Sequence, residues 1–342
     1  MRRIPLLLAI LTLFAILMSC ASATEVTVVK ADPDAKIAYT NPVWSPDGRY
    51  IAYVGATYAT DPNEPTFGKT DTSVYVASAA SGKWVSKEIA KGADWPVWSA
   101  DSKRLVVAQS GLTIVDVSTG KVTKVTKRGL ATNPDYPLSW SPNGRYVAYI
   151  SYRNDVPTPL IRDLKGMKDL AVAPGMEGVW TGDGKYLTAA GTDGPGWLKL
   201  IDPLSGQSTL LLDQLGVRHP FIPKSGTAAW VLLTPTGPHG EGVYAVDLKK
   251  KTLVKQTALH ALELGWSPNA ANYAFITMYS PNKTVAPKST MYLGTTSPWA
   301  FKIAAKDAAK TDDKQHQHLQ WAPNSKSIAY VTELGDIKIL KL

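Results

Sequence analysis

Five histidines are the residues of this chain best suited to chemistry. His316 and His318 form a His-x-His pair, and His260 lies upstream, close to Glu263. Neutral imidazole binds zinc, copper, iron or nickel, and a nearby carboxylate also admits manganese. One hypothesis is therefore a divalent-metal site built from His260, His316 and His318. The alternative is that these are solvated loop histidines and that the protein binds no cofactor.

The sequence motifs of the common enzyme classes are missing. The chain has no Gly-x-Ser-x-Gly nucleophile motif, no phosphate-binding glycine loop and no calcium-loop spacing. Four aspartates recur at equivalent places before a turn, which favours a structural role in hairpins over a catalytic one: Asp116, Asp163, Asp202 and Asp247. The sequence therefore points to no catalytic residue.

The N-terminus has the pattern of an export signal. Two arginines precede an apolar run over residues 4–18, which is shorter than the roughly 20 residues that span a bilayer as a helix. The run ends in Leu-Met-Ser-Cys, which resembles a bacterial lipobox. We predict a signal peptide over residues 1–19, cleaved before a lipid-modified Cys20. The alternative is cleavage after Ala23, which gives a soluble secreted protein.

An internal repeat dominates the rest of the chain. Seven strings share an aromatic anchor, a polar turn and an apolar strand, as in NPVWSPDGRYIAYVG, PLSWSPNGRYVAYIS and HLQWAPNSKSIAYVT. The anchors recur every 40 to 55 residues, at Trp44, Trp98, Trp140, Trp180, Phe221, Trp266 and Trp321. A period of this length, with four strands' worth of sequence per unit, is typical of β-propeller blades.

Each repeat also predicts its own local structure. Asx-Gly or Asx-Ser pairs three residues after the anchor, such as Asp47-Gly48, favour a tight hairpin. Eight and nine residues after the anchor, a small residue precedes a large one, as in Ala52 and Tyr53, which suits sheets packed face to face. No segment has sustained helical periodicity.

These strings resemble the TolB-type, WD40-like repeat of the PD40 kind, from Glu25 to Leu342. The resemblance implies a propeller used as a recognition surface in the bacterial cell envelope, although relatives of the repeat also occur in peptidases and lyases. The α/β domain that precedes the propeller in TolB is missing here. Oligogalacturonate lyase has similar repeats and holds manganese through histidines near its final blade. Residues 315–318 resemble that region only loosely.

We predict an all-β fold: a seven-bladed β-propeller of four-stranded antiparallel blades over residues 24–342, with six blades as the fallback if one repeat is degenerate. The last repeat has only three strands before the sequence stops. The stretch TEVTVVKA from Thr24 stands where every other blade has the outer strand of its predecessor. We expect it to complete blade seven, because this closes the ring and removes an open edge.

Loop lengths distinguish the two faces of the predicted propeller. First-to-second and third-to-fourth turns share one face and are short, whereas the other face holds the long insertions: 55–72, 127–136, 234–242, 280–288 and 304–316. Variable loops on a rigid scaffold commonly carry binding residues. Residues three before each anchor should ring the channel mouth on this face. These ring residues are Asn41, Trp95, Pro137, Glu177, Arg218, Glu263 and His318. The candidate binding face consists of Asn41, Trp95, Glu177, Arg218, His219, Glu263 and His318.

Composition and charge limit the partners. With 44% hydrophobic and 19% charged residues the chain can bury a core, and the net charge is +9. Basic residues are scattered along the sequence, whereas nucleic-acid binding needs them gathered on one face, so no nucleic-acid partner is expected. We predict a monomeric, non-catalytic binding or scaffolding propeller at the cell envelope that recognises a protein or glycan partner. The alternative is a metal-dependent, polysaccharide-lyase-like enzyme that uses the histidines on the same face.

Overall fold

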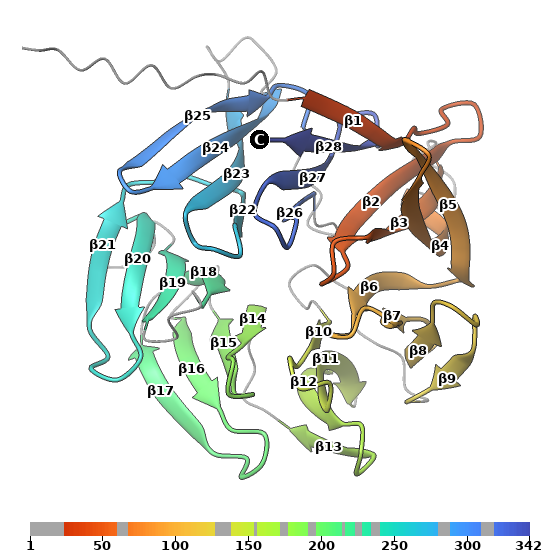
Figure 1. Ribbon diagram of the computed structural model, residues 1–342. Coiled ribbons are helices and arrows are strands. Elements are labelled where there is room, and N and C mark those ends of the chain that lie inside the picture. The colour runs from red at the N-terminus through yellow and green to blue at the C-terminus, as the bar shows by residue number, and fades with distance from the viewer. Residues whose placement is uncertain are drawn as a thin grey trace, which may run out of the picture.

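The computed structural model describes residues 24–59, 68–126, 138–153, 156–171, 177–190, 196–213, 216–222, 228–233, 240–279, 288–308 and 318–342. These residues form seven separate four-stranded antiparallel sheets arranged around a central axis (Figure 1). The described part of the chain contains strands and turns and no helix. The predicted seven-bladed propeller is confirmed.

The blades follow one another in chain order. The strands of blades one to three are β2 (Ile37–Trp44), β3 (Tyr50–Ala59), β4 (Gly68–Ala80), β5 (Lys83–Lys91), β6 (Asp94–Trp98), β7 (Arg104–Ala108), β8 (Leu112–Asp116), β9 (Val122–Lys124), β10 (Ser139–Trp140), β11 (Tyr146–Arg153), β12 (Val156–Asp163) and β13 (Lys168–Ala171). Those of blades four and five are β14 (Glu177–Trp180), β15 (Tyr186–Ala190), β16 (Trp197–Ile201), β17 (Ser208–Asp213), β18 (Val217–Phe221), β19 (Ala228–Leu233), β20 (Gly242–Asp247) and β21 (Leu253–Thr257). Blade six has β22 (Glu263–Trp266), β23 (Asn272–Tyr279), β24 (Lys288–Thr296) and β25 (Trp299–Ala305).

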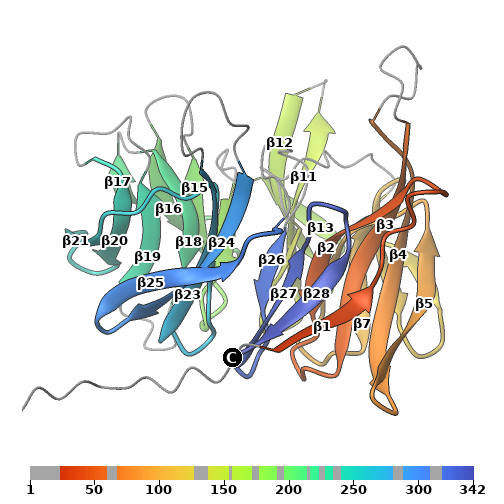
Figure 2. The same ribbon diagram turned by 90° about the horizontal axis from the view of Figure 1, so that it is seen from above.

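Blade seven joins the two ends of the chain. Its strands are β26 (Leu319–Trp321), β27 (Ser327–Val331), β28 (Ile337–Lys341) and, as the outer strand, β1 (Thr24–Val29). β1 pairs antiparallel with β28, so that Thr24 lies opposite Lys341 (Figures 1 and 2). The predicted ring closure by the N-terminal strand is therefore confirmed.

Polar contacts fasten β1 to the rest of blade seven. The Glu25 carboxylate accepts a hydrogen bond of 2.8 Å from the Tyr330 hydroxyl and contacts Lys338 Nζ at 3.3 Å. Lys338 Nζ also lies 2.7 Å from the Asp307 carboxylate, which follows β25 of blade six. Burial and these two carboxylates raise the pKa of Tyr330, so its hydroxyl stays a donor. The closing strand is thus tied both to its own blade and to the neighbouring one.

The core lies between adjacent blades. The residues eight after each anchor are almost fully buried, at most 3% exposed: Ala52, Val106, Ala148, Thr188, Ala229, Ala274 and Ala329. The large residues beside them, such as Tyr53, Phe275 and Tyr330, are buried as well. Phe221, which replaces tryptophan in blade five, stacks on Trp266 of blade six with ring centroids 5.7 Å apart. The alternation of small and large residues thus produces the packing that the sequence predicted.

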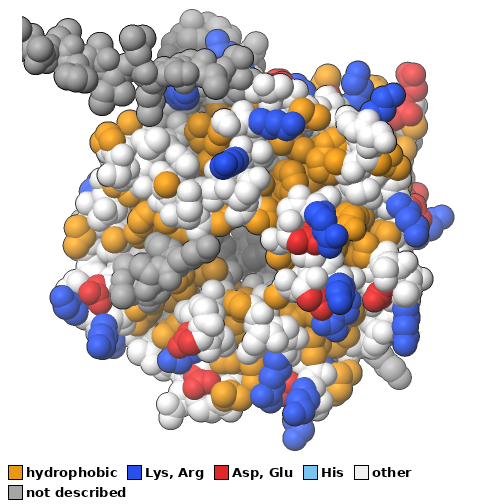
Figure 3. Space-filling model, viewed as in Figure 1, with side chains coloured by type: hydrophobic (Ala, Val, Ile, Leu, Met, Phe, Trp, Pro, Cys, Tyr) orange, Lys and Arg blue, Asp and Glu red, His pale blue; other side chains and the backbone are white. Residues whose placement is uncertain are grey.

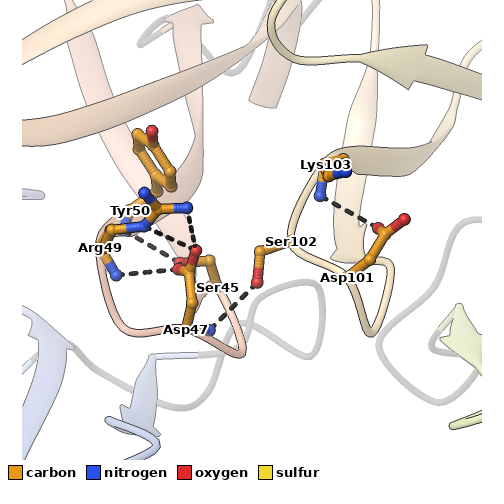
Figure 4. A network of polar contacts seen from close by, with 7 residues as sticks. All are labelled: Ser45, Asp47, Arg49, Tyr50, Asp101, Ser102 and Lys103. Atoms are coloured by element: carbon orange, nitrogen blue, oxygen red, sulfur yellow. Dashed lines mark hydrogen bonds and ion pairs between the residues drawn. The ribbon is translucent and has the colours of Figure 1, made fainter.

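The polar turn of the repeat is a closed hydrogen-bond network (Figure 4). In blade one, the Ser45 hydroxyl donates to Asp47 at 2.6 Å and accepts from the Tyr50 amide at 3.0 Å. The Asp47 carboxylate also accepts from the Arg49 amide at 3.1 Å, and Gly48 has a φ of 73°, which favours glycine. The side chains of Ser-Pro-Asp-Gly-Arg therefore stabilise the turn through hydrogen bonds within it.

The same turns also join neighbouring blades. The Asp47 amide donates to Ser102 Oγ of blade two at 3.1 Å (Figure 4), and the Asn269 amide of blade six donates to Ser325 Oγ of blade seven at the same distance. In both cases a serine takes the place that glycine holds in Asp47-Gly48. These serines adopt the same positive φ that favours glycine, at 58° for Ser102 and 59° for Ser325, and their hydroxyls accept a hydrogen bond from the preceding blade.

The recurrent aspartates before the third turn have the predicted structural role. Each accepts hydrogen bonds from backbone amides of the turn that follows it, as Asp116 does from Ser118 and Thr119. Hydrogen bonds from the Ser118 hydroxyl and from Thr119 lower the pKa of Asp116 to about 2. Turn hydrogen bonds likewise lower the pKa values of Asp202 and Asp247. These carboxylates are charged acceptors that hold hairpins together.

Two faces are defined by the strand order, as expected. The tight-turn face carries the first-to-second and third-to-fourth turns of every blade, and the long-connection face carries the second-to-third and interblade connections (Figure 2). One expected loop is shorter than predicted, because β3 and β4 continue to Ala59 and from Gly68. The cores of the other predicted insertions lie outside the described residues.

Candidate functional site at the channel mouth

The innermost strands form the wall of the central channel. β26, β2, β6, β10, β14, β18 and β22 contact one another in this order around the ring. The candidate binding positions Asn41, Trp95, Glu177, Arg218 and Glu263 lie on these strands, and His318 directly precedes β26. They sit toward the long-connection face, because each is separated from the tight turn by the anchor residue.

A carboxylate and a histidine join blades six and seven at this mouth. Glu263 Oε1 accepts hydrogen bonds of 2.9 Å from the backbone amides of His318 and Leu319, and Glu263 Oε2 lies 3.0 Å from His318 Nδ1. The two side chains are only 13% and 5% exposed. Charge-assisted hydrogen bonds of this kind are stronger than neutral ones, so this pair fixes the start of β26 against β22.

A second contact joins blades one and two. Asp94 Oδ1 accepts from Asn41 Nδ2 at 3.4 Å and from the Trp95 amide at 2.8 Å. Asn41 and Trp95 have positive φ values of 54° and 51°, each directly before a proline and within an irregularity of the strand pairing. A tryptophan in this conformation is a genuine outlier. The bulge turns both side chains into the protein, where Asn41 is 1% and Trp95 8% exposed.

The remaining predicted residues are only partly placed. Glu177 lies on β14 and Arg218 and His219 lie on β18, but their side chains are outside what the structure describes. Cys20, Pro137 and His316 lie outside the described residues altogether. A binding role for the whole set stays a prediction.

The described residues do not assemble the predicted metal site. His260, 65% exposed, pairs with Glu241 at 2.7 Å, whereas His318 is buried and pairs with Glu263. Within the described part of the chain, no three His, Cys, Asp or Glu residues form a group that could hold a metal ion. Because His316 lies outside the described residues, the described histidines alone do not make up the predicted donor set.

Two mouth residues were missed by the sequence analysis. Asp94 precedes Trp95 and accepts from both bulged residues, and Gln320 Oε1 accepts from the Trp44 amide at 2.5 Å across blades seven and one. Neither residue lies three positions before an anchor, which is where the channel-mouth residues were expected. The proline that follows Asn41 and Trp95, within a strand, is the sequence signal that would have indicated the bulge and hence Asp94; no signal pointed to Gln320.

Comparison with known proteins identifies the class of fold. Oligogalacturonate lyase from Vibrio parahaemolyticus matches with a TM-score of 0.68 and 11% identity over 93% of this chain and 97% of that chain. Oligogalacturonate lyase in complex with manganese matches with 0.69 and 14% over 94% and 96%. TolB from Acinetobacter baumannii matches with 0.51 and 16% over 86% and 68%. Identities this low show the fold alone.

The chain is therefore a seven-bladed β-propeller whose structural neighbours include TolB and an oligogalacturonate lyase in complex with manganese. No protein-family model matches the sequence, and no curated protein matches it. None of the described residues belongs to a helix long and apolar enough to cross a membrane.

Proposed function

We propose that this protein is an exported binding propeller, held at the bacterial cell envelope by a lipid on Cys20, which recognises a protein or glycan partner with its long-connection face. It acts as a monomer and catalyses no reaction. The lipidation rests on the lipobox-like sequence before Cys20 and on the apolar run over residues 4–18.

The difference between the two faces carries this proposal. On the tight-turn face, side chains such as Ser45 and Asp47 are occupied in internal turn networks. On the other face, the connections vary in length. The innermost strands beside them, which form the channel wall, are held in place by contacts such as that between Glu263 and His318. A rigid wall with variable connections suits recognition, because fewer degrees of freedom are lost when a partner binds.

Two exposed leucines allow a matched test. Leu334, in the connection between β27 and β28, is 74% exposed on the long-connection face, and Leu204, between β16 and β17, is 73% exposed on the tight-turn face. A photo-cross-linking amino acid is placed at either position in the full chain and activated in native envelopes. We expect discrete protein or glycan adducts from position 334 and none from position 204. Adducts from position 204 alone would contradict the proposal.

The second candidate is a metal-dependent enzyme that acts on a polyanionic carbohydrate. Its support is the likeness to oligogalacturonate lyase over most of both chains and the contact of Glu263 with His318 Nδ1. A carboxylate that holds one ring nitrogen orients the other, as in many metal-binding histidines. Metal content of the purified protein distinguishes the two candidates. A stoichiometric metal that is lost in His318→Ala and retained in His260→Ala would favour the enzyme.

A further inference from the structure

The first-to-second turns place a ring of basic residues on the tight-turn face. The residue five after the anchor is basic in five of the seven repeats: Arg49, Lys103, Arg145, Lys185 and Lys326. Arg49 is 71% exposed, and Arg145 and Lys185 are 41% and 43% exposed. These basic residues are far apart in the sequence. They share one face of the protein because every repeat places this position in its first-to-second turn.

The third-to-fourth turns add further basic residues to the same face. Lys121 ends the turn of blade two, Lys165 lies in that of blade three, and Lys249, Lys250 and Lys251 form that of blade five. All of these side chains are exposed. Figure 3, which views the propeller from this side, shows Lys and Arg spread over the face and standing at its outer rim.

The acidic residues of this face are fewer and are held within the turns. Asp47 pairs with Arg49 at 2.7 Å, Asp163 with Arg145 at 2.8 Å and Asp183 with Lys185 at 3.4 Å, so each of these aspartates is held by a basic residue of the turns. By contrast, the described connections of the opposite face carry charges of both signs, with Asp34 and Glu333 alongside Lys30, Lys36 and Lys306. Among the described residues, the excess of basic side chains therefore lies at the tight turns.

Apolar side chains protrude from the same positive face. Leu204, at the tip of the β16–β17 turn, is 73% exposed, and Met167, at the tip of the β12–β13 turn, is 51% exposed. Leu204 borders a groove between blades three and four that is lined by Arg145 and Lys185 and also by Asp183 and Asp202. Surfaces that bind the bilayer interface combine exposed apolar side chains, which enter the headgroup region, with lysines and arginines, which attract anionic lipids.

The described chain also starts on this face. Thr24 lies opposite Lys341, and Lys341 pairs with Ser327, which follows the tight turn of blade seven. The chain that precedes Thr24 therefore enters the propeller on its positive side. We propose that the tight-turn face docks on an anionic lipid bilayer, with its Lys and Arg side chains on the headgroup phosphates and Leu204 and Met167 in the interface. This surface is distinct from the partner-binding face and does not require a lipid on Cys20.

Vesicle binding by a chain that starts at Thr24 tests this inference. This form contains the complete ring, because β1 begins at Thr24 and closes blade seven. It is sedimented with vesicles of phosphatidylcholine alone or mixed with phosphatidylglycerol. We expect binding only to the anionic vesicles, weakening as salt is raised because exposed charges are screened. Each lysine near such a surface is worth roughly fivefold in partitioning.

Matched variants locate the binding face. The triple variant K249Q/K250Q/K251Q should bind anionic vesicles roughly a hundredfold more weakly. The control K30Q/K36Q/K306Q removes the same charge from exposed positions in interblade connections of the other face, and should bind as the parent does. Leu204→Ser should also weaken binding at unchanged charge. Equal losses in both triple variants, or preference for a DNA duplex over anionic vesicles at the same salt, would overturn the proposal.

Discussion

Glu25, near the start of the described chain, accepts a hydrogen bond from Tyr330, near its end, at 2.8 Å. This contact and the pairing of β1 with β28 mean that blade seven is built from both ends of the protein. The stability of the ring should therefore depend on the first described residues.

Deletion of residues 24–30 should destabilise the whole domain. It removes Val28, 7% exposed and packed with Ile337 and Ile339, together with an entire strand of hydrogen bonds. We expect the thermal unfolding midpoint to fall by roughly 10 °C or more, measured by circular dichroism. Glu25→Ala should lower it less, since the strand itself remains. An unchanged midpoint after the deletion would show that the strand does not close the ring.

The anchor tryptophans should be major contributors to stability. Trp140 and Trp321 are 7% and 5% exposed, and Trp321 Nε1 donates to the Gly265 carbonyl of blade six at 3.1 Å. Truncation of either to alanine should cost about 3 to 5 kcal/mol of unfolding free energy in urea titrations. Trp44 is partly exposed and should cost less. Ready quenching of Trp321 fluorescence by acrylamide in the native state would be inconsistent with this packing.

The Glu263 contact should be structural at neutral pH. Glu263→Ala leaves two amides at the start of blade seven without their acceptor, so the unfolding free energy should fall by about 2 kcal/mol or more. The matched control is Glu241→Ala, whose partner His260 is 65% exposed, and which should change stability by no more than about 0.5 kcal/mol. Similar losses in the two variants would remove the distinction between buried and exposed pairs.

The turn aspartates should make the protein sensitive to acid. Their pKa values are lowered in the folded state, to about 2 for Asp116. Such groups stabilise the fold above the unfolded-state pKa of about 3.9, and this contribution is lost as the pH falls toward 2. A carbon-detected NMR titration should give the Asp116 value directly. Asp116→Asn keeps the acceptor oxygen, so its acid-induced loss of stability should be smaller than that of the parent.

Lipidation should fix the orientation of the full chain. Cys20 precedes Thr24 by four residues, and an extended chain reaches at most about 3.6 Å per residue, so the lipid must lie within about 15 Å of the tight-turn face. A dye at Asn143, in a tight turn, should be quenched by lipid-borne probes more strongly than one at Leu334. The reverse order would exclude this orientation. A Cys20→Ala protein released with its N-terminus at Thr24 would weaken the case for lipidation.

The sequence predicted the fold well because each repeat contains the residues that determine its local structure. The anchor, the Asx-Gly turn and the small-large pair each have a local physical cause, so seven copies define seven blades. The closing strand was also predictable, since one blade lacked its fourth strand. Among the described residues, the long hairpin of β3 and β4 was missed, because strand extension beyond a repeat leaves no periodic signal.

The site was less predictable because it depends on contacts between blades. Counting back from the anchor placed Asn41 and Trp95 at the channel mouth, but the positive φ values bury their side chains and make Asp94 their partner. The concentration of basic residues on one face was also hidden, since Arg49 and Lys326 are far apart in the sequence. The sequence shows that these residues are basic, but only the closed ring shows that they share one face.

The pairing of β1 with β28 also has a consequence for folding kinetics. The contact between Glu25 and Tyr330 spans 305 residues, so the loop-closure entropy it requires is among the largest in the chain. Blades one to six can form their local hairpins as the chain emerges, but the last blade must wait for the C-terminal strand. Ring closure should therefore be the slow, late step, and until then the apolar faces of blades one and six that pack against blade seven stay exposed, which favours aggregation.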